Sequence, residues 1–296
     1  MVDYQAKGTN KMLRDRLIYG FIGVCLLVLV LYIGGWLFKL SVLLLALLAS
    51  SEMYKAFQKK GEKPLKFTGL AIVTLFYVQH YYFTYKNPTN TISIDLSRDF
   101  LYIILATLLV STVALLAKDR GPKDAIVTIY ATLYPGILFI FAYLLGSANH
   151  LYNNQTLPSN FLLIIVLLST FSTDTFAYFV GRALGKKKLC PDISPNKTVA
   201  GSVGGLVGSM LITLVAGIVL SRHFQLEIHS SHFIAIGLLC GILSQAGDLN
   251  ASLIKRYCNI KDFGNILPGH GGVMDRCDSL LFTMPLGYIY YIIFLL

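Results

Sequence analysis

About nine long apolar runs divide this chain, and they constrain its fold more than any other feature. Each run is close to the ~20 residues that an α-helix needs to cross a hydrocarbon core of about 30 Å. Helix is favoured over strand because the runs are continuously apolar and rich in leucine, and because lipid offers no hydrogen-bond partner to an open backbone. The runs are centred near Val24, Leu45, Thr74, Thr107, Pro135, Leu168, Leu211, Gly241 and Tyr288. The sequence therefore predicts an all-α, polytopic integral membrane protein with about nine transmembrane helices.

The charged residues predict how these helices are oriented. Of the 296 residues only 14% are charged, whereas soluble domains carry about 25%. The net charge of +10 could suggest a nucleic-acid partner, but the distribution of the charge argues against one. With nine spans and a cytoplasmic N-terminus, 21 of the 25 Lys and Arg residues lie on the inner side of the membrane. The other four, Lys39, Lys86, Arg98 and Arg222, lie on the outer side. This positive-inside bias predicts a multi-pass protein of the cell (inner) membrane, with its C-terminus outside.

The distribution of polarity predicts three parts. Residues 1–16 form a basic cytoplasmic tail, residues 17–159 about five N-terminal transmembrane helices, and residues 160–296 a catalytic region of about four helices with cytoplasmic loops. In the first half of the chain Glu52 is the one acid close to the membrane interior, and Pro135 predicts a kink in the fifth span. Two overlapping GxxxG patterns, formed by Gly201, Gly204, Gly205 and Gly208, indicate close helix packing.

The most polar stretch of the second half runs from 244 to 279, between two apolar helices. Asp248, Ser252 and Lys255 lie at i, i+4 and i+7 and share one face of the incoming helix. Asp275 and Asp278 lie at i and i+3, so they can converge from the start of the outgoing helix. Two helix ends thus offer three carboxylates to a common point. Carboxylates near the membrane interior are costly, so we interpret them, together with Asp174, as functional.

A long motif lies within this stretch, and two shorter motifs precede it. They read Ser252-x-x-Lys255-Arg256-x4-Lys261-Asp262-x-Gly264-x-x-Leu267-Pro268-x-His270-Gly271-Gly272-x-x-Asp275-Arg276-x-Asp278, Asp174-x-x-Ala177-Tyr178-x-x-Gly181-Arg182 and Ile193-Ser194-Pro195-x-Lys197-Thr198. The long motif resembles the signature of the phosphatidate cytidylyltransferases, also called CDP-diacylglycerol synthases. The resemblance covers roughly the second half of the chain, since the first half is similar only in being apolar helices. Ala200 departs from the family pattern, which has a glutamate there.

The resemblance implies Mg²⁺-dependent transfer of CMP from CTP to phosphatidate at the cytoplasmic membrane face. The products are pyrophosphate and CDP-diacylglycerol, a precursor in phospholipid biosynthesis. The residues expected to act in catalysis are Asp248, Lys255, Asp275 and Asp278, and the three aspartates are also the expected metal ligands. Oxygen-only carboxylate clusters suit Mg²⁺, as one ion or as a two-metal clamp. Asp174 is either a further metal or substrate group or a structural partner of a lysine or arginine.

The remaining polar residues are expected to bind the phosphates of the two substrates. Cations attract phosphate oxygens, hydroxyls donate hydrogen bonds to them, and glycines let backbone N–H groups approach closely. The set comprises Arg182, Ser194, Lys197, Thr198, Ser252, Arg256, Lys261, His270, Gly271, Gly272 and Arg276. The expected partners are CTP, phosphatidate and membrane lipid, and the resemblance allows a homodimer. Two alternatives stay open: a CTP-dependent polyprenol or lipid kinase, and a transporter whose intramembrane aspartates bind coupling ions.

Overall fold

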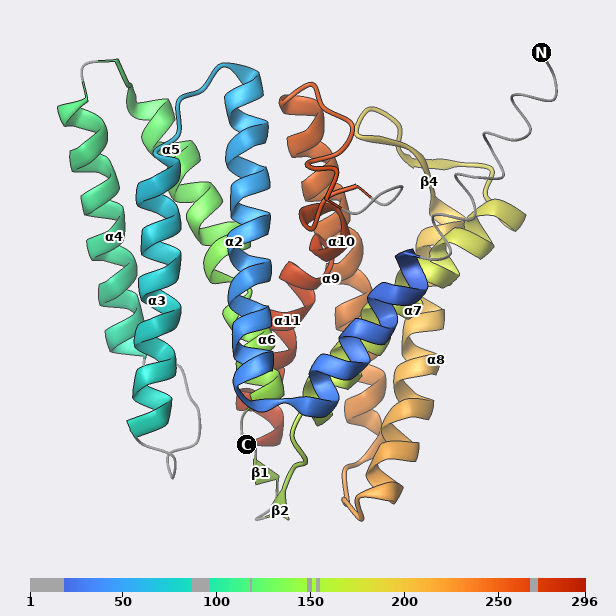
Figure 1. The fold of residues 1–296 in the computed structure, drawn as a ribbon. Helices are drawn as coiled ribbons and strands as arrows, with labels where there is room; N and C mark the ends of the chain where they lie inside the picture. The colour runs from blue at the N-terminus through green and yellow to red at the C-terminus, as the bar shows by residue number, and fades with distance from the viewer. Residues whose placement is uncertain (1–18, 87–95, 118, 148–150, 153–154, 267–270) are drawn as a thin grey trace.

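The computed structural model describes residues 19–86, 96–117, 119–147, 151–152, 155–266 and 271–296, most of them helical (Figure 1). The predicted tail, residues 1–16, lies outside this part of the chain. After an apolar helix, Tyr19–Ile33, the order is α2 (Gly35–Lys60), α3 (Lys66–Lys86), α4 (Leu96–Leu116), α5 (Pro122–Ala131), η1 (Thr132–Ile137), α6 (Ile140–Ser147), β1 (Leu151–Tyr152), β2 (Gln155–Thr156), α7 (Phe161–Leu184), β3 (Lys188–Cys190), β4 (Ser194–Thr198), α8 (Val199–His223), α9 (Ser230–Tyr257), α10 (Met274–Cys277), α11 (Leu280–Tyr290) and η2 (Tyr291–Leu295). In the part of the chain that the structure describes, the strands form two small antiparallel pairs, β1–β2 and β3–β4. The predicted all-α class is confirmed.

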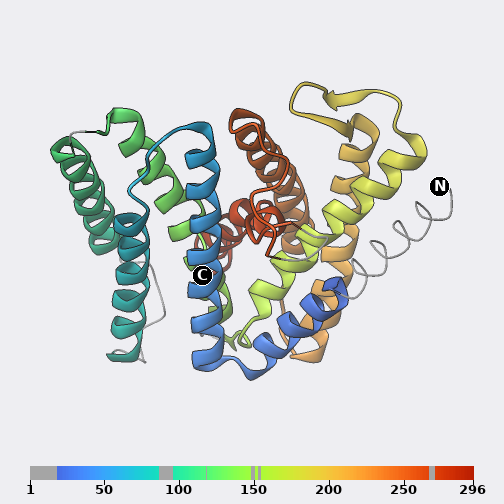
Figure 2. The ribbon, with the colours of Figure 1, turned by 45° about the horizontal axis from the view of Figure 1, so that its top comes forward.

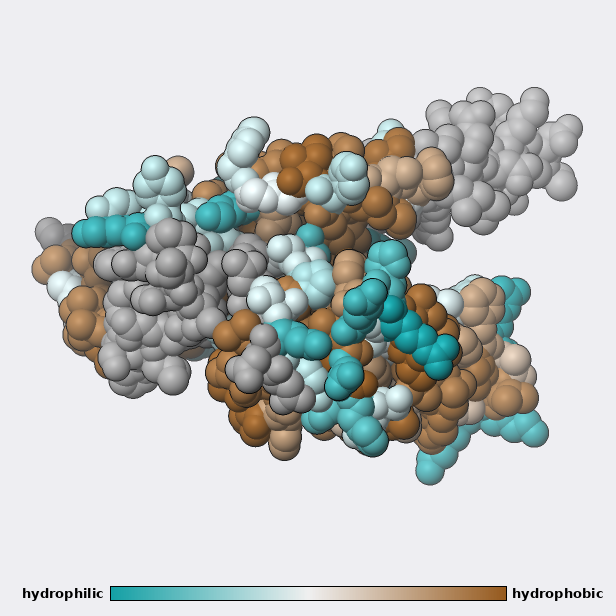
Figure 3. Space-filling view, turned by 90° about the horizontal axis from the view of Figure 1, so that it is seen from below, coloured by the Kyte–Doolittle hydropathy of each residue, from teal (hydrophilic) through white to brown (hydrophobic). Residues whose placement is uncertain are grey.

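Among the described residues, five helical segments are long and apolar enough to cross a membrane: α2, Pro122–Gly146, α7, α8 and α9. Shorter apolar helices cover Tyr19–Ile33, Leu101–Ala114 and Leu280–Leu295. One face of α8 leaves Val203, Val207, Leu211, Val215 and Val219 exposed, which is the arrangement expected of a helix against lipid. Figure 3 views the molecule from the lower end of Figure 1, where β1 and β2 lie. Polar side chains gather in the middle of this end, and much of the rim is apolar. The chain is a multi-pass membrane protein; nine spans and the orientation of the termini stay predictions.

The helices form two groups with the last helix between them. α2, α3, α4 and the α5–α6 segment make one group, while α7, α8 and α9 make the other (Figure 1). Between the two groups, α11 packs against α6 on one side and against α7 and α9 on the other. One buried core joins both groups and contains residues from Phe38 to Leu295. The α2–α3 and α4–α5 connections, the β3–β4 hairpin and the C-terminal end of α9 all lie at one end (Figure 1).

The fifth apolar run is bent at Pro135, as predicted. Proline removes one backbone hydrogen bond, and the chain forms a π-helical segment there, η1, between α5 and α6. The Tyr77 hydroxyl donates to the carbonyl of Gly136 at 3.1 Å, so the irregular backbone is stabilised from α3. The bend therefore has a local chemical cause.

The GxxxG glycines of α8 lie against α7. A Cβ atom on Gly201 would come within 2.6 Å of the Ala177 carbonyl oxygen, and one on Gly205 within 2.9 Å of the Thr173 carbonyl oxygen. The missing side chains let the two backbones approach closely, which is the usual function of such patterns. Predicted close helix packing is confirmed, and it fixes α7 beside the β4–α8 junction.

Candidate active site

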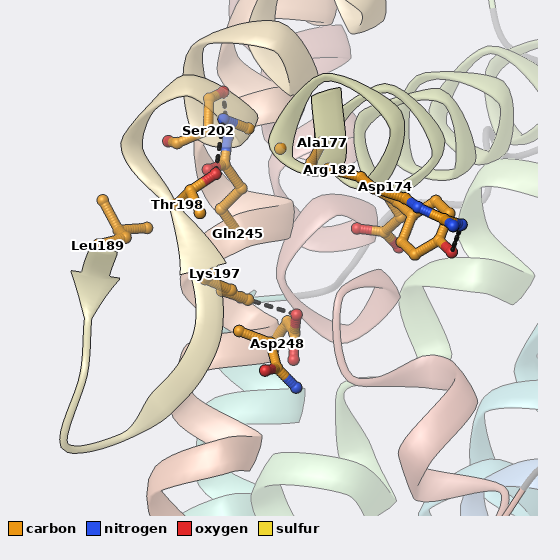
Figure 4. A pocket seen from close by; sticks show the side chains of 13 residues that line it. Asp174, Ala177, Arg182, Leu189, Lys197, Thr198, Ser202, Gln245 and Asp248 are labelled. Atoms are coloured by element: carbon orange, nitrogen blue, oxygen red, sulfur yellow. Dashed lines mark hydrogen bonds and ion pairs between the residues drawn. The ribbon is translucent and has the colours of Figure 1, made fainter. Parts of the chain in front are cut away.

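A cavity of about 430 Å³ lies between α7, the β3–β4 hairpin, α8 and α9 (Figure 4). Its polar walls come from the two shorter motifs and from the start of the long polar stretch. The lining includes Asp174, Tyr178, Arg182, Lys197, Thr198, Ser202, Gln245 and Asp248. Residues predicted as functional from separate segments between Asp174 and Asp248 thus share one cavity.

An ion pair crosses this cavity. The ammonium group of Lys197, on β4, lies 2.7 Å from a carboxylate oxygen of Asp248, on α9 (Figure 4). The two side chains are 22% and 35% exposed, but the ammonium nitrogen of Lys197 is itself buried beneath the cavity surface. The pair therefore places a positive and a negative group side by side in the cavity wall.

Three of the predicted carboxylates are close neighbours. Asp248 repels the negative charges of both Asp174 and Asp278. Asp174 accepts a hydrogen bond from the Ser244 hydroxyl at 3.3 Å, while Asp278 is buried and accepts one from its neighbour's backbone N–H at 2.8 Å. A Cβ atom on Gly247 would lie 2.6 Å from the Asp278 carbonyl oxygen. Gly247 therefore lets α9 approach the α10–α11 turn closely enough to bring these aspartates together.

Asp275, predicted to join the metal ligands, points elsewhere. One of its carboxylate oxygens accepts from the Lys255 ammonium at 3.0 Å. The other accepts from the backbone N–H groups of Phe263 at 2.8 Å and Gly272 at 3.0 Å. Only 4% of the side chain is exposed. Asp275, on α10, and Lys255, on α9, thus pair across the loop that joins these helices, and both oxygens of Asp275 are engaged there.

Several residues predicted to bind substrate have structural partners. The Thr198 hydroxyl caps α8 by accepting from the Gly201 N–H at 3.1 Å. Arg256 donates to the carbonyl of Ile193 at 3.2 Å and so ties α9 to the β3–β4 hairpin. At the edge of the cavity, Arg182 donates to the Tyr178 hydroxyl at 3.2 Å. These contacts position the cavity walls and leave Lys197 as the cation that lies against a carboxylate there.

The other predicted binding residues are spread along the same end of the chain. Ser194 is paired with Cys190 in the hairpin, and Ser252 is half-buried on α9, while Lys261 and Arg276 are exposed. Gly271 adopts a positive φ of 82°, a conformation that favours glycine. The N–H of Gly272 is engaged by Asp275, so that amide is not directed at a phosphate. His270 lies outside the described residues.

Two polar residues of α9 were not predicted and join it to neighbouring helices. Gln245 donates to the Ser202 carbonyl at 3.2 Å, which links α9 to α8 at the cavity. Asn250 donates to the Tyr130 hydroxyl at 3.2 Å, which links α9 to α5. Their only signal in the sequence is that both lie within three residues of Asp248, in the polar stretch that begins at 244. They hold the helix that carries Asp248 from both sides.

The donor set suits a magnesium ion. Asp174, Asp248 and Asp278 offer carboxylate oxygens only, which Mg²⁺ prefers, and it commonly uses one or two of them together with waters and substrate phosphates. Within the residues that the structure describes, no group of three acidic, histidine or cysteine side chains forms a ready-made metal cage.

Comparison with known proteins shows the family of the chain. Residues 14–294 match the model of the cytidylyltransferase family. The chain belongs to the cytidylyltransferase family. The predicted resemblance is confirmed, and the match extends through the first half of this cytidylyltransferase, where only apolar helices were noted in the sequence.

Individual relatives align with nearly the whole length of this cytidylyltransferase. It is 32% identical to the phosphatidate cytidylyltransferase of Bacillus subtilis (strain 168) over 277 residues, which are 93% of this chain and 96% of the relative. The enzyme of the same name from Staphylococcus haemolyticus is 32% identical over 93% of this chain and 97% of its own length. That from Synechocystis is 30% identical over 95% and 97%, respectively.

Proposed function

We propose that this cytidylyltransferase transfers CMP from CTP to phosphatidate and releases pyrophosphate. A phosphate oxygen of the lipid attacks the α-phosphorus of CTP, and the bond from that phosphorus to the oxygen bridging the α- and β-phosphates breaks. The product is CDP-diacylglycerol. The observation that carries the proposal is a cavity of a membrane protein in which Lys197 pairs with Asp248 and Asp174 also lines the wall, while Asp278 lies near Asp248. Both substrates are anionic, so charge neutralisation and alignment are the main tasks of such a site.

The side chains divide these tasks between them. Lys197 provides fixed positive charge for a phosphate, and exposed Arg182 extends that charge to the edge of the cavity. Asp248 and Asp278 would hold Mg²⁺ with Asp174 beside them, and the ion would neutralise the phosphates as the leaving pyrophosphate gains charge. The lipid phosphate is already ionised at neutral pH, so the attack needs no strong general base. Asp275 and Lys255 act by fixing the loop, and Gln245 and Asn250 by fixing α9.

The reaction is expected to stop when divalent metal is removed. Purified protein in detergent, given phosphatidate and CTP, should form CDP-diacylglycerol and an equal amount of pyrophosphate, as measured by mass spectrometry and a pyrophosphate assay. EDTA should abolish both products, and added Mg²⁺ should restore them, because phosphate charge is then neutralised again. Full activity in EDTA would contradict a role for Mg²⁺, whereas absence of CDP-diacylglycerol with Mg²⁺ present would contradict the reaction itself.

In the same proposal the active site faces the cytoplasm, with nine spans and the C-terminus outside. Its support is that the Lys- and Arg-rich connections lie at the same end as the β3–β4 hairpin (Figure 1). In a protein with Cys25 and Cys190 replaced by serine, a membrane-impermeant maleimide should label Gln225→Cys in intact cells. It should label Asp192→Cys only after permeabilisation, because the β3–β4 turn and the α8–α9 turn lie on opposite sides. The reverse pattern would overturn the orientation.

A further inference from the structure

Glu52 lies on α2, in the half of the chain to which neither the cavity nor the signature residues belong. Its side chain is buried, with only 2% of the residue exposed. One carboxylate oxygen accepts from the backbone N–H of Val273 at 3.1 Å, and the other accepts from that of Met274 at 2.8 Å. These contacts span more than 200 residues of sequence and end at the first turn of α10.

The loop between α9 and α10 is shaped around this carboxylate. A Cβ atom on Gly264 or on Gly272 would collide with the carboxylate oxygens of Glu52. The two glycines lie on either side of the undescribed residues 267–270, so Glu52 touches both described arms of the loop. Figure 2 shows the α10–α11 segment enclosed between α2 on one side and α7 and α9 on the other. The close approach of Glu52 thus explains why both positions need glycine, without any contact to substrate.

Two carboxylates together organise this loop. Asp275 engages the N–H groups of Phe263 and Gly272 from within it, while Glu52 engages the next two N–H groups from α2. Buried backbone donors need such partners, because an unpaired one is unfavourable. The loop's end leads directly into α10 and Asp278, so its position sets where Asp278 lies relative to Asp248 on α9.

We propose that Glu52 is a positioning residue for the reaction: it fixes the α10 segment so that Asp278 meets Asp248 at the cavity. The inference rests on the proposed function. It assigns the N-terminal helices a direct part in building the active site, through a residue that touches neither the reacting atoms nor the cavity. Outer partners of this kind commonly change activity by about 10- to 100-fold when they are replaced.

The test compares Glu52→Gln with Glu227→Gln, the same chemical change at an exposed residue of the α8–α9 turn. Glutamine keeps the length of Glu52 but replaces one acceptor oxygen with an NH₂ group. One of the two backbone N–H groups therefore loses its hydrogen-bond acceptor. We expect Glu52→Gln to lower kcat about 10- to 100-fold and to raise the Mg²⁺ concentration for half-maximal rate, with KM for CTP within a few-fold of that of the parent protein. Unchanged kcat and Mg²⁺ requirement in folded Glu52→Gln would overturn the proposal, as would an equal loss in Glu227→Gln.

A second readout does not depend on catalysis. Cys277 is a buried thiol at the end of α10, so its rate of reaction with a maleimide, followed by mass spectrometry, reports whether that segment is held. The rate should rise at least several-fold in Glu52→Gln and stay at the parent value in Glu227→Gln. This comparison remains valid if the protein proves to catalyse another reaction, so failure of the proposed function and failure of the positioning role are distinguishable. An unchanged Cys277 rate would overturn the positioning role.

Gly264→Ala provides the same test from the loop side if Glu52→Gln fails to fold. The added methyl group would press on the Glu52 carboxylate while leaving its charge unchanged. We expect the same pattern, a lower kcat and faster labelling of Cys277, and parent values for both would contradict the proposal.

Discussion

Asp248→Asn is expected to reduce CMP transfer by about 1,000-fold while the protein stays folded and membrane-inserted. Asparagine has nearly the same shape, so the packing of α9 should be retained. What changes is the charge beside Lys197, near Asp174 and Asp278. In the proposed site a divalent ion would lose an anionic ligand, and Lys197 loses the partner 2.7 Å away that orients its ammonium group. Both losses act on the phosphates being joined.

The measurement is the initial rate of CDP-diacylglycerol formation at saturating CTP, together with thermal unfolding in detergent. Asp192→Asn is the matched control, since Asp192 is exposed in the turn of the β3–β4 hairpin and does not line the cavity. It should retain the parent rate. A folded Asp248→Asn protein with near-normal turnover would remove Asp248 from the metal site.

Lys255→Met should have its largest effect on stability. The Lys255 and Asp275 side chains are 17% and 4% exposed and form a pair at 3.0 Å. Removing the ammonium group leaves the Asp275 carboxylate buried with its two backbone donors and without its cation. Breaking a buried pair in this way costs about 3–5 kcal/mol. The free energy of unfolding, measured by titration with sodium dodecyl sulfate in mixed micelles, should fall by that amount.

A second lysine–aspartate pair provides the control. Lys63 and Asp119 lie 3.4 Å apart with side chains that are 56% and 67% exposed. Exposed pairs contribute at most about 1 kcal/mol, because water solvates both charges and salt screens them. Lys63→Met should therefore change the unfolding free energy little. Equal losses in the two variants would contradict the assignment of Lys255–Asp275 as a buried structural pair.

Local patterns in the sequence predicted the features that depend on local physics. Continuous apolar runs predicted the helices, Pro135 predicted the bend, and the glycines of α8 predicted close helix packing, although not the helix against which they pack. The helical spacing placed Asp248, Ser252 and Lys255 on one helix, which α9 confirms. Each of these depends on the period of a helix or on the chemistry of one residue type, so it can be read without knowing the tertiary structure.

The division of roles among the acids could not be read in that way. Asp275 and Asp278 lie three residues apart, so a regular helix would place them on the same face. Asp275 instead accepts from N–H groups of the α9–α10 loop, while Asp278 lies near Asp248. Because α10 ends after four residues, regular spacing from its start says little about where each side chain points. Glu52 engages N–H groups that lie 221 and 222 residues later. Such a contact is decided by packing between helices.

The central claim is tested most directly by following each phosphate of CTP. The purified protein would be given phosphatidate, Mg²⁺ and CTP labelled at either the α- or the γ-phosphate, with Asp248→Asn as the inactive control. Label from the α-position should appear in lipid as pyrophosphate is released, and label from the γ-position should stay in the aqueous phase. Transfer of the γ-label to lipid would make the protein a lipid kinase, and no transfer of either label by folded protein would contradict an enzymatic role on phosphatidate.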